Sequence, residues 1–202
     1  MSRARVAVLV SGSGSNLQAL IDAARTPDHP AELAVVVSNV SGAFALERAR
    51  QAGLPTEVVS HRDFSERAVY DAELVRRLRA HAVEWVCLAG FMRLLGPTFL
   101  QAFPMRVLNV HPALLPAFPG MHAPRQALEA GVKLTGCTVH FVDEGADTGP
   151  IIAQAAVEVL DTDDVEALAT RIQAQEHRLY PQALALAVSG RLRLEGRRVL
   201  SA

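Results

Sequence analysis

The chain has 202 residues, half of them hydrophobic, and its charges nearly cancel to a net −1 at pH 7. A chain of this size can bury a core without disulfides or a structural metal. The balanced charge argues against a nucleic-acid or membrane-surface partner, so we expect small-molecule ligands. Cys87 and Cys137 lack the spacing of zinc or redox sites, which favours a reducing compartment. With no apolar run near ~20 residues, we expect a cytoplasmic protein.

The N-terminal segments alternate between strand and helix patterns. Residues 5–10 and 33–38 are valine-rich apolar runs, typical of strands buried on both faces of a parallel sheet. Residues 15–25 between them carry apolar side chains at helical spacing, which predicts a β-α-β opening. The alternation then predicts a helix at 42–52, a short strand at 57–59, a helix at 63–81 with Val69, Leu74, Val75 and Leu78 on one face, and a strand at 85–89.

The second half of the chain is less regular. Four prolines between positions 112 and 124 predict a loop there, and whether the Leu115-Pro116 bond is cis stays open. The final helix is expected to start at Asp163, with Asp163 or Thr162 as its cap, to bury Val165, Leu168 and Ile172, and to bend or restart at Pro181. The other predicted elements are a short helix at 97–102, a strand at 106–110, a helical turn at 125–129, and an antiparallel pair at 134–142 and 151–159. The fold class is therefore α/β, a Rossmann-like doubly wound, mostly parallel sheet with a mixed C-terminal half.

A Ser-Gly-Ser-Gly-Ser-Asn loop at residues 11–16 joins the first strand to the first helix. Glycines at this place let backbone N–H groups approach an anion at a helix N-terminus. A dinucleotide fingerprint would need a third glycine at Leu17 and an acid near Ser38, so the loop indicates a monophosphate rather than NAD. The alternative is a tight turn with Ser15 as the helix cap.

The pair Asn109 and His111 closes the strand predicted at 106–110. Side chains two positions apart on a strand project to the same side, and ligands gather at strand carboxyl ends in open α/β sheets. An amide donor beside a histidine suits an acyl-type transfer, because the amide can stabilise an oxyanion while the histidine moves a proton. The alternative is a structural histidine bonded to backbone.

An acidic, glycine-containing loop follows at residues 143–150. Asp143 and Glu144 are typical of solvated turn residues, whereas Asp147 precedes a stiff Thr-Gly-Pro turn and can face a cleft. The histidines at 111, 122, 140 and 177 do not have metal-site spacing, so we expect no metal. Gly12-Ser13-Gly14 is not the nucleophile turn of a serine hydrolase.

Four ordered motifs spanning almost the whole chain carry a resemblance: Ser11 to Leu17, Leu88 to Leu95, Leu108 to Pro116 and Asp147 to Ile151. Together they resemble the phosphoribosylglycinamide formyltransferases, within the wider folate-dependent formyltransferase superfamily. Two departures are mild: Ser13 replaces the commoner Asn, and Pro124 stands where similar proteins often have a polar residue. The resemblance implies that 10-formyltetrahydrofolate, as co-substrate, donates a formyl group to the amine of glycinamide ribonucleotide in de novo purine synthesis.

The resemblance also implies binding roles along one domain, residues 1–202, with a nucleotide-binding half at about 1–103 and a folate-binding and catalytic half at about 104–202. The ribonucleotide would contact Gly14, Ser15, Asn16, Leu17 and Gln18, together with Gln173 and Glu176 on the last helix, whose alternative is a solvated helix face. The folate would contact Arg67, Met92, Arg93, Leu94, Leu95, Asn109, Asp143, Glu144, Gly145, Ala146 and Asp147.

The expected catalytic residues are Asn109, His111 and Asp147. The attack of the amine on the formyl carbon creates an oxyanion, which Asn109 and protonated His111 can stabilise, while the Asp147 carboxylate favours the charged ring. Three alternatives remain: a methionyl-tRNA formyltransferase, disfavoured by the expected single domain and neutral charge; a formyltetrahydrofolate deformylase, disfavoured because the first strand starts near residue 5; and a non-catalytic binding module, which would not need this triad. Oligomeric state is not predicted.

Overall fold

The computed structural model describes residues 3–201 of the chain. They form two compact units, unit 1 (Met1–Leu108) and unit 2 (Asn109–Ala202), and each is described by itself. Among the described residues, no helix combines the length and the apolar character needed to cross a membrane.

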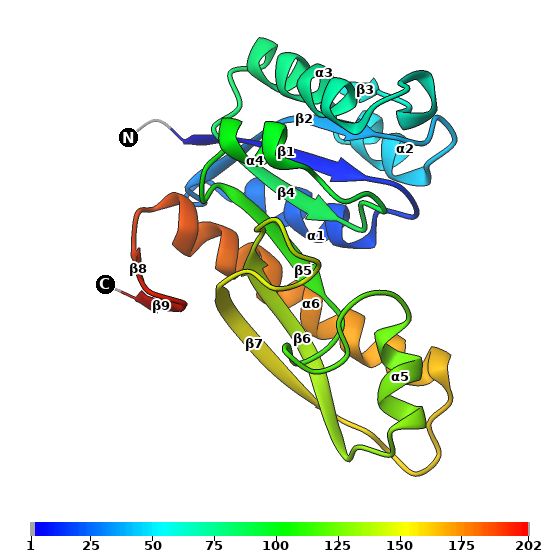
Figure 1. Ribbon diagram of the computed structural model, residues 1–202. Coiled ribbons are helices and arrows are strands. Elements are labelled where there is room, and N and C mark those ends of the chain that lie inside the picture. The colour runs from blue at the N-terminus through cyan, green and yellow to red at the C-terminus, as the bar shows by residue number, and fades with distance from the viewer. Residues whose placement is uncertain (1–2, 202) are drawn as a thin grey trace. The chain divides into compact units, whose positions relative to one another are not determined.

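Unit 1 contains a parallel sheet (Figure 1). Its strands are β1 (Ala4–Val10), β2 (Ala31–Ser38), β3 (Thr56–Val58) and β4 (Trp85–Ala89), in the order β3-β2-β1-β4. All three pairings are parallel, and β1 aligns Val10 with Ser38 of β2 and with Ala89 of β4. The last five residues of β1 are fully buried, as the continuous apolar run predicts. Because the four strands are parallel, their carboxyl ends meet at one edge of the sheet.

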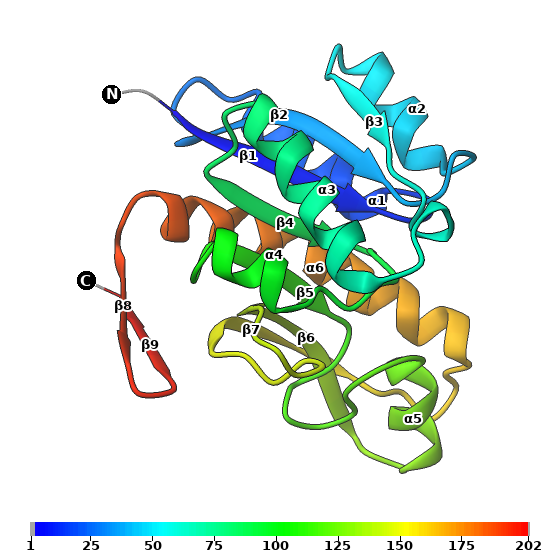
Figure 2. The same cartoon turned by 45° about the horizontal axis from the view of Figure 1, so that its top comes forward.

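The helices of unit 1 are α1 (Ser15–Ala24), α2 (Phe44–Gln51), α3 (Arg67–Ala80) and α4 (Pro97–Ala102), with a short 3₁₀ turn, η1 (His61–Asp63). The pairs α1–α2 and α3–α4 are in contact, and Figures 1 and 2 show α1 and α3 on opposite faces of the sheet. The expected helix at 63–81 is too long: α3 begins only at Arg67, because Asp63 belongs to η1 and the backbone is extended at Phe64 and Glu66. Val69, predicted inside, is 51% exposed, since the buried stripe of α3 runs through Tyr70, Leu74 and Leu78.

Unit 2 is built on an antiparallel pair covered by a long helix. Strand β5 (Val107–His111) crosses the boundary between the units, and β6 (Leu134–Phe141) pairs antiparallel with β7 (Ile151–Glu158) as predicted. Helix α6 (Val165–Val188) packs on both β6 and β7, and α5 (Ala123–Glu129) packs on α6. Their shared core contains Ala127, Cys137, Val157, Val159, Leu168 and Ile172. The predicted α/β class, with parallel N-terminal strands and a mixed C-terminal half, is confirmed.

Several details of unit 2 differ from the sequence predictions. The cap of α6 is Asp164, which accepts a hydrogen bond from the Ala167 N–H at 2.8 Å, while Asp163 binds Arg171 instead. Val165, expected inside, is 38% exposed, and α6 continues through Pro181. A hairpin of β8 (Leu192–Glu195) and β9 (Arg198–Ser201) was not predicted, and the Leu115-Pro116 peptide bond is cis.

Candidate functional site

The glycine-rich loop after β1 is held against α2. Gly14 caps α1 with a left-handed φ of 75°, so the alternative with Ser15 as the cap is wrong. A Cβ on Gly14 would lie 2.6 Å from the Cβ of Ala45, and the Ala45 N–H donates to the Gly12 carbonyl at 3.0 Å. No side chain caps α1, and its first turn has no acidic residue. A helix N-terminus of this kind suits an anion.

A cation that the sequence reasoning missed stands beside this loop. The Arg48 guanidinium on α2 donates to the Ser13 carbonyl at 2.9 Å and lies 3.4 Å from the side-chain oxygen of Gln18. It also stacks over the Phe44 ring at 5.0 Å. In the sequence, Arg48 only stands one helical turn after Ala45 on α2. The contact of α2 with the loop, which gives Arg48 its role, is visible only in the fold. Arg48 therefore adds positive charge where the loop predicts a phosphate.

Ser11 connects the first loop to two other strand ends of unit 1. Its Oγ donates to Asn39 Oδ1 at 2.6 Å and accepts from the Met92 N–H at 2.9 Å. Ser11, Asn39 and Met92 follow β1, β2 and β4, whose carboxyl ends share one edge of the sheet. The predicted ribonucleotide loop and the predicted folate segment are thus hydrogen-bonded to each other.

The predicted folate segment at residues 92–95 presents apolar side chains to solvent. Met92 and Leu94 are exposed, whereas Leu95 is buried. Arg67, at the start of α3, packs closely against Gly96: a Cβ added to Gly96 would lie 2.8 Å from the Arg67 Nε. The Gly96 N–H donates a hydrogen bond to the buried Asp71 at 2.8 Å. Exposed apolar groups suit the aromatic body of a ligand, and the Arg67 guanidinium suits a negative group.

Asn109, His111 and Asp147 come together in unit 2, as the sequence reasoning expected. His111 Nε2 lies 2.8 Å from the Phe118 carbonyl, and Nδ1 lies 3.3 Å from Asp147 Oδ2. A carbonyl oxygen only accepts, so Nε2 carries a proton and Nδ1 faces the carboxylate. A second proton on Nδ1 completes an ion pair with Asp147. The His111 side chain is therefore bonded to backbone and to the carboxylate at once.

A second imidazole, which the sequence reasoning considered only as a metal ligand, joins this group. His140 on β6 is buried, with Nε2 3.2 Å from Asn109 Nδ2 and 3.6 Å from Asp147 Oδ1. Asn109 Nδ2 is in turn 3.4 Å from Asp147 Oδ1. The signal available in the sequence was a histidine in an apolar strand that leads directly into the 143–147 loop. The four residues form a polar cluster, which we call the Asp147 cluster: Asn109, His111, His140 and Asp147.

Asp147 is held ionised at the centre of this cluster. Burial opposes its charge, but the side-chain contact with His140, the hydrogen bond from the Gly120 N–H at 2.8 Å and the charge of His111 outweigh burial and lower its pKa. Its side chain is only 14% exposed. Its backbone has a left-handed φ of 56°, a conformation rare for residues with a side chain. Strained backbone of this kind is concentrated at functional sites.

The rest of the 143–147 loop is ordered mainly by Asp143. Its Oδ1 accepts from the Gly145 N–H at 3.1 Å and from the Thr148 hydroxyl at 2.6 Å, which closes the turn. Glu144, Gly145 and Ala146 are exposed. Asp143 therefore shapes the loop, and the exposed residues provide its open surface.

The predicted ribose pair on α6 is divided. Gln173 is exposed, whereas Glu176 is buried, so the alternative of a solvated helix face is wrong for Glu176. Burial, and then the charge of Glu176, raise the pKa of the Cys137 thiol to about 12. Only Gln173 is therefore open to a ligand without movement in unit 2.

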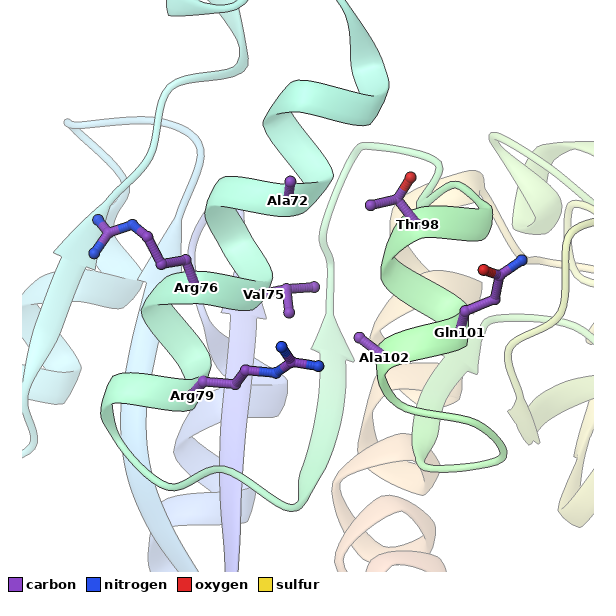
Figure 3. Close-up of a pocket in the computed structure, with 7 residues that line it drawn as sticks. All are labelled: Ala72, Val75, Arg76, Arg79, Thr98, Gln101 and Ala102. Atoms are coloured by element: carbon purple, nitrogen blue, oxygen red, sulfur yellow. The ribbon is translucent and has the colours of Figure 1, made fainter.

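A groove of about 500 Å³ lies between α3 and α4 in unit 1 (Figure 3). Its lining includes Val75, Arg79, Thr98 and Arg76, and Arg76 is bonded to Glu73 at 2.7 Å. None of the predicted site residues lines this groove. The chemistry suggested by the sequence is therefore on the strand ends and the 143–147 loop.

An anion-type loop after the first strand of a parallel sheet is typical of the ligand-binding α/β class of proteins, and unit 2 adds an amide–imidazole–carboxylate cluster. A family model described as formyl transferase matches residues 4–184. The chain belongs to the formyl transferase family.

Individual relatives agree with this assignment. The phosphoribosylglycinamide formyltransferase of Escherichia coli (strain K12) is 46% identical over 189 residues, which is 94% of this chain and 89% of that protein. The trifunctional purine biosynthetic protein adenosine-3 of Drosophila pseudoobscura pseudoobscura is 56% identical over 193 residues, or 95% of this chain. The chain spans only 14% of the length of that relative.

Solved structures extend the likeness to three dimensions. The crystal structure of glycinamide ribonucleotide transformylase 1 from Symbiobacterium toebii has a TM-score of 0.97 and 54% identity, and the match covers 98% of this chain and 94% of that one. The phosphoribosylglycinamide formyltransferase of Brucella melitensis has a TM-score of 0.89 at 45% identity, with 100% of both chains covered.

Proposed function

We propose that the chain is a phosphoribosylglycinamide formyltransferase that transfers the formyl group of 10-formyltetrahydrofolate to the amine of glycinamide ribonucleotide, in de novo purine synthesis. The observation that carries the proposal is the Asp147 cluster, because it combines an amide donor, an imidazole and an ionised carboxylate within hydrogen-bonding range. The named relatives that match nearly full length support the choice of substrates. The proposal includes one formyltransferase domain and a cytoplasmic enzyme without nucleic-acid or membrane partners.

Local geometry supports the proposed binding roles. The uncapped N-terminus of α1 and the nearby Arg48 suit the ribonucleotide phosphate, with Gly14 to Gln18 around it. The exposed Met92 and Leu94 suit the apolar rings of the folate, and Arg67 suits its carboxylates. We further assign the 143–147 loop to the folate and Gln173 and Glu176 to the ribose.

The reaction forms one C–N bond, to the amine, and breaks another, to the folate nitrogen. The neutral amine attacks the formyl carbon, and the carbonyl oxygen becomes an oxyanion. Asn109 donates to that oxygen, the positive charge of the protonated His111 ring stabilises it electrostatically, and Asp147 in turn stabilises the charged ring. The intermediate collapses by breaking the bond to the folate nitrogen, which takes up the proton that the amine loses, through His111 and water. Holding both substrates in place contributes much of the acceleration, with effective molarities of ~10⁵ M or more in well-oriented reactions.

An absorbance assay of tetrahydrofolate release tests this function. Purified protein is mixed with 10-formyltetrahydrofolate, with and without glycinamide ribonucleotide. We expect release only when the ribonucleotide is present. Release without it would identify a deformylase, and no release in either mixture would refute the transferase.

A further inference from the structure

His140, the penultimate residue of β6, makes two hydrogen-bond contacts and one longer contact. It is 2% exposed, and its Nδ1 lies 2.8 Å from the Phe141 carbonyl. Its Nε2 lies 3.2 Å from Asn109 Nδ2, within hydrogen-bond range, and 3.6 Å from Asp147 Oδ1, beyond that range. The imidazole is therefore fixed on one side by backbone and is aimed at Asn109 on the other.

These contacts determine which ring nitrogen carries the proton. The Phe141 carbonyl can only accept, so Nδ1 must donate to it. In the neutral ring, Nε2 is then a lone-pair acceptor, and the Asn109 amide N–H donates to it. A second proton on Nε2 would remove this acceptor and turn the ring towards Asp147. The neutral ring is thus the form that binds Asn109.

The amide of Asn109 can in principle sit in two orientations, with nitrogen and oxygen exchanged. In the observed orientation, its nitrogen faces His140 Nε2 at 3.2 Å and Asp147 Oδ1 at 3.4 Å. In the exchanged orientation, the amide oxygen would face a lone pair and a carboxylate, which are both acceptors. Because such contacts are repulsive, His140 and Asp147 together select the orientation that presents N–H groups to the centre of the cluster.

We propose that neutral His140 is a positioning residue for formyl transfer: it holds one N–H of the Asn109 amide and thereby directs the other N–H, which faces Asp147, towards the developing oxyanion. The N–H that faces Asp147 is the weaker of the two bonds, so it can be shared with an oxygen that becomes charged beside His111. This inference rests on the proposed function for its kinetic consequence, but the orientation itself is a property of the protein without substrates.

The orientation is tested first by nuclear magnetic resonance on the full chain labelled with ¹⁵N, without substrates. A long-range ¹H–¹⁵N spectrum at neutral pH should show His140 protonated at Nδ1 and unprotonated at Nε2, with the assignment made from the signals lost in His140→Gln. The Nε2-protonated tautomer, or a doubly protonated ring, would overturn the inference. This measurement does not depend on activity, so it remains decisive if the formyl-transfer assay fails.

The kinetic test compares two substitutions. His140→Leu removes the acceptor, so kcat should fall at least tenfold. The upper limit is about 10²–10³-fold, the effect of losing one oxyanion donor completely. The KM for glycinamide ribonucleotide should stay within twofold. His140→Gln keeps an oxygen that can accept at the position of Nε2, so its kcat should stay within about threefold of the parent. His29→Leu, on unit 1 and outside the cluster, is the control and should leave kcat unchanged.

The outcomes separate positioning from a purely structural role. If His140→Leu keeps kcat within threefold, or if His140→Gln is as slow as His140→Leu while both remain folded by circular dichroism, the positioning role is wrong. If His140→Leu does not fold, the Gln variant and the tautomer decide the question, since a folded Gln variant with parent-like kcat supports the acceptor role. A parent chain that shows the predicted tautomer but transfers no formyl group would refute the proposed function instead.

Discussion

Gly14 offers a direct test of how the loop after β1 is held. Replacing it with alanine adds a Cβ that would lie 2.6 Å from Ala45 Cβ and 2.7 Å from Ala45 Cα, at a backbone φ of +75°. These neighbouring atoms belong to the start of α2, so no side-chain rotation relieves the clash. The left-handed backbone costs about 1–2 kcal/mol and overpacking about 1–3 kcal/mol, so we expect a loss of roughly 2–5 kcal/mol in the free energy of unfolding.

Thermal unfolding followed by circular dichroism measures this loss. For a chain of this length, each kcal/mol lowers Tm by about 2–4 °C, so Gly14→Ala should lower Tm by at least about 4 °C. Gly12→Ala is the matched control in the same loop, because its added Cβ meets nothing within 4 Å. Its effect should stay within about 0.5 kcal/mol. Equal Tm values for the two variants would show that the close approach of Gly14 to α2 is not what constrains the loop.

Three other substitutions probe the site. His111→Ala should abolish turnover and retain ribonucleotide binding by calorimetry; a loss of only a few-fold would remove His111 from the centre of the reaction. Asp147→Asn should lower kcat and move its pH optimum downward. Because the pKa of Asp147 is lowered in the fold from 3.8, its charge stabilises the native state above about pH 4, and this contribution is lost as pH falls further. Tm of the parent should therefore drop more steeply than that of Asp147→Asn as the pH falls through and below 4, and parallel curves would contradict this. Ser11→Ala removes the bonds to Asn39 and Met92 and should cost about 1–2 kcal/mol by thermal unfolding, whereas an unchanged Tm would show that these bonds do not hold the strand ends together.

Elements with a strong pattern were predictable from sequence. Strands β1, β2 and β4 were predictable because each is a short, continuously apolar run. Such runs are typical of strands that are buried on both faces of a parallel sheet. Boundaries were less predictable: Asp163 and Asp164 are both good caps, and the choice depends on Arg171, which binds Asp163. The β8–β9 hairpin has no clear alternation over its four-residue strands.

The site was predictable to the extent that its residues lie near one another in sequence or match a known family. Asn109 and His111 share one strand end, and Asp147 stands out before its stiff Thr-Gly-Pro turn; the resemblance added the ligands that they would bind. Arg48 and His140 were missed because their importance depends on tertiary neighbours: α2 against the first loop, and the amide of Asn109 against β6. The apolar strand around His140 indicates burial, but a lone histidine or arginine carries no pattern that identifies its tertiary partners.

Asp147, with its left-handed backbone, connects the position of the 143–147 loop to the protonation of two imidazoles. Its carboxylate divides its two oxygens between two imidazoles, while its backbone is part of the loop assigned to the folate. A ligand that displaces the loop changes the electrostatic partner of both rings, and proton binding to the rings changes the energy of the loop. Coupling of two binding equilibria is reciprocal. If donor binding displaces the loop and so changes proton binding to the rings, pH must change the affinity for the donor by the same factor. In the proposed enzyme, chemistry and donor recognition would therefore be linked through one side chain rather than through a long pathway.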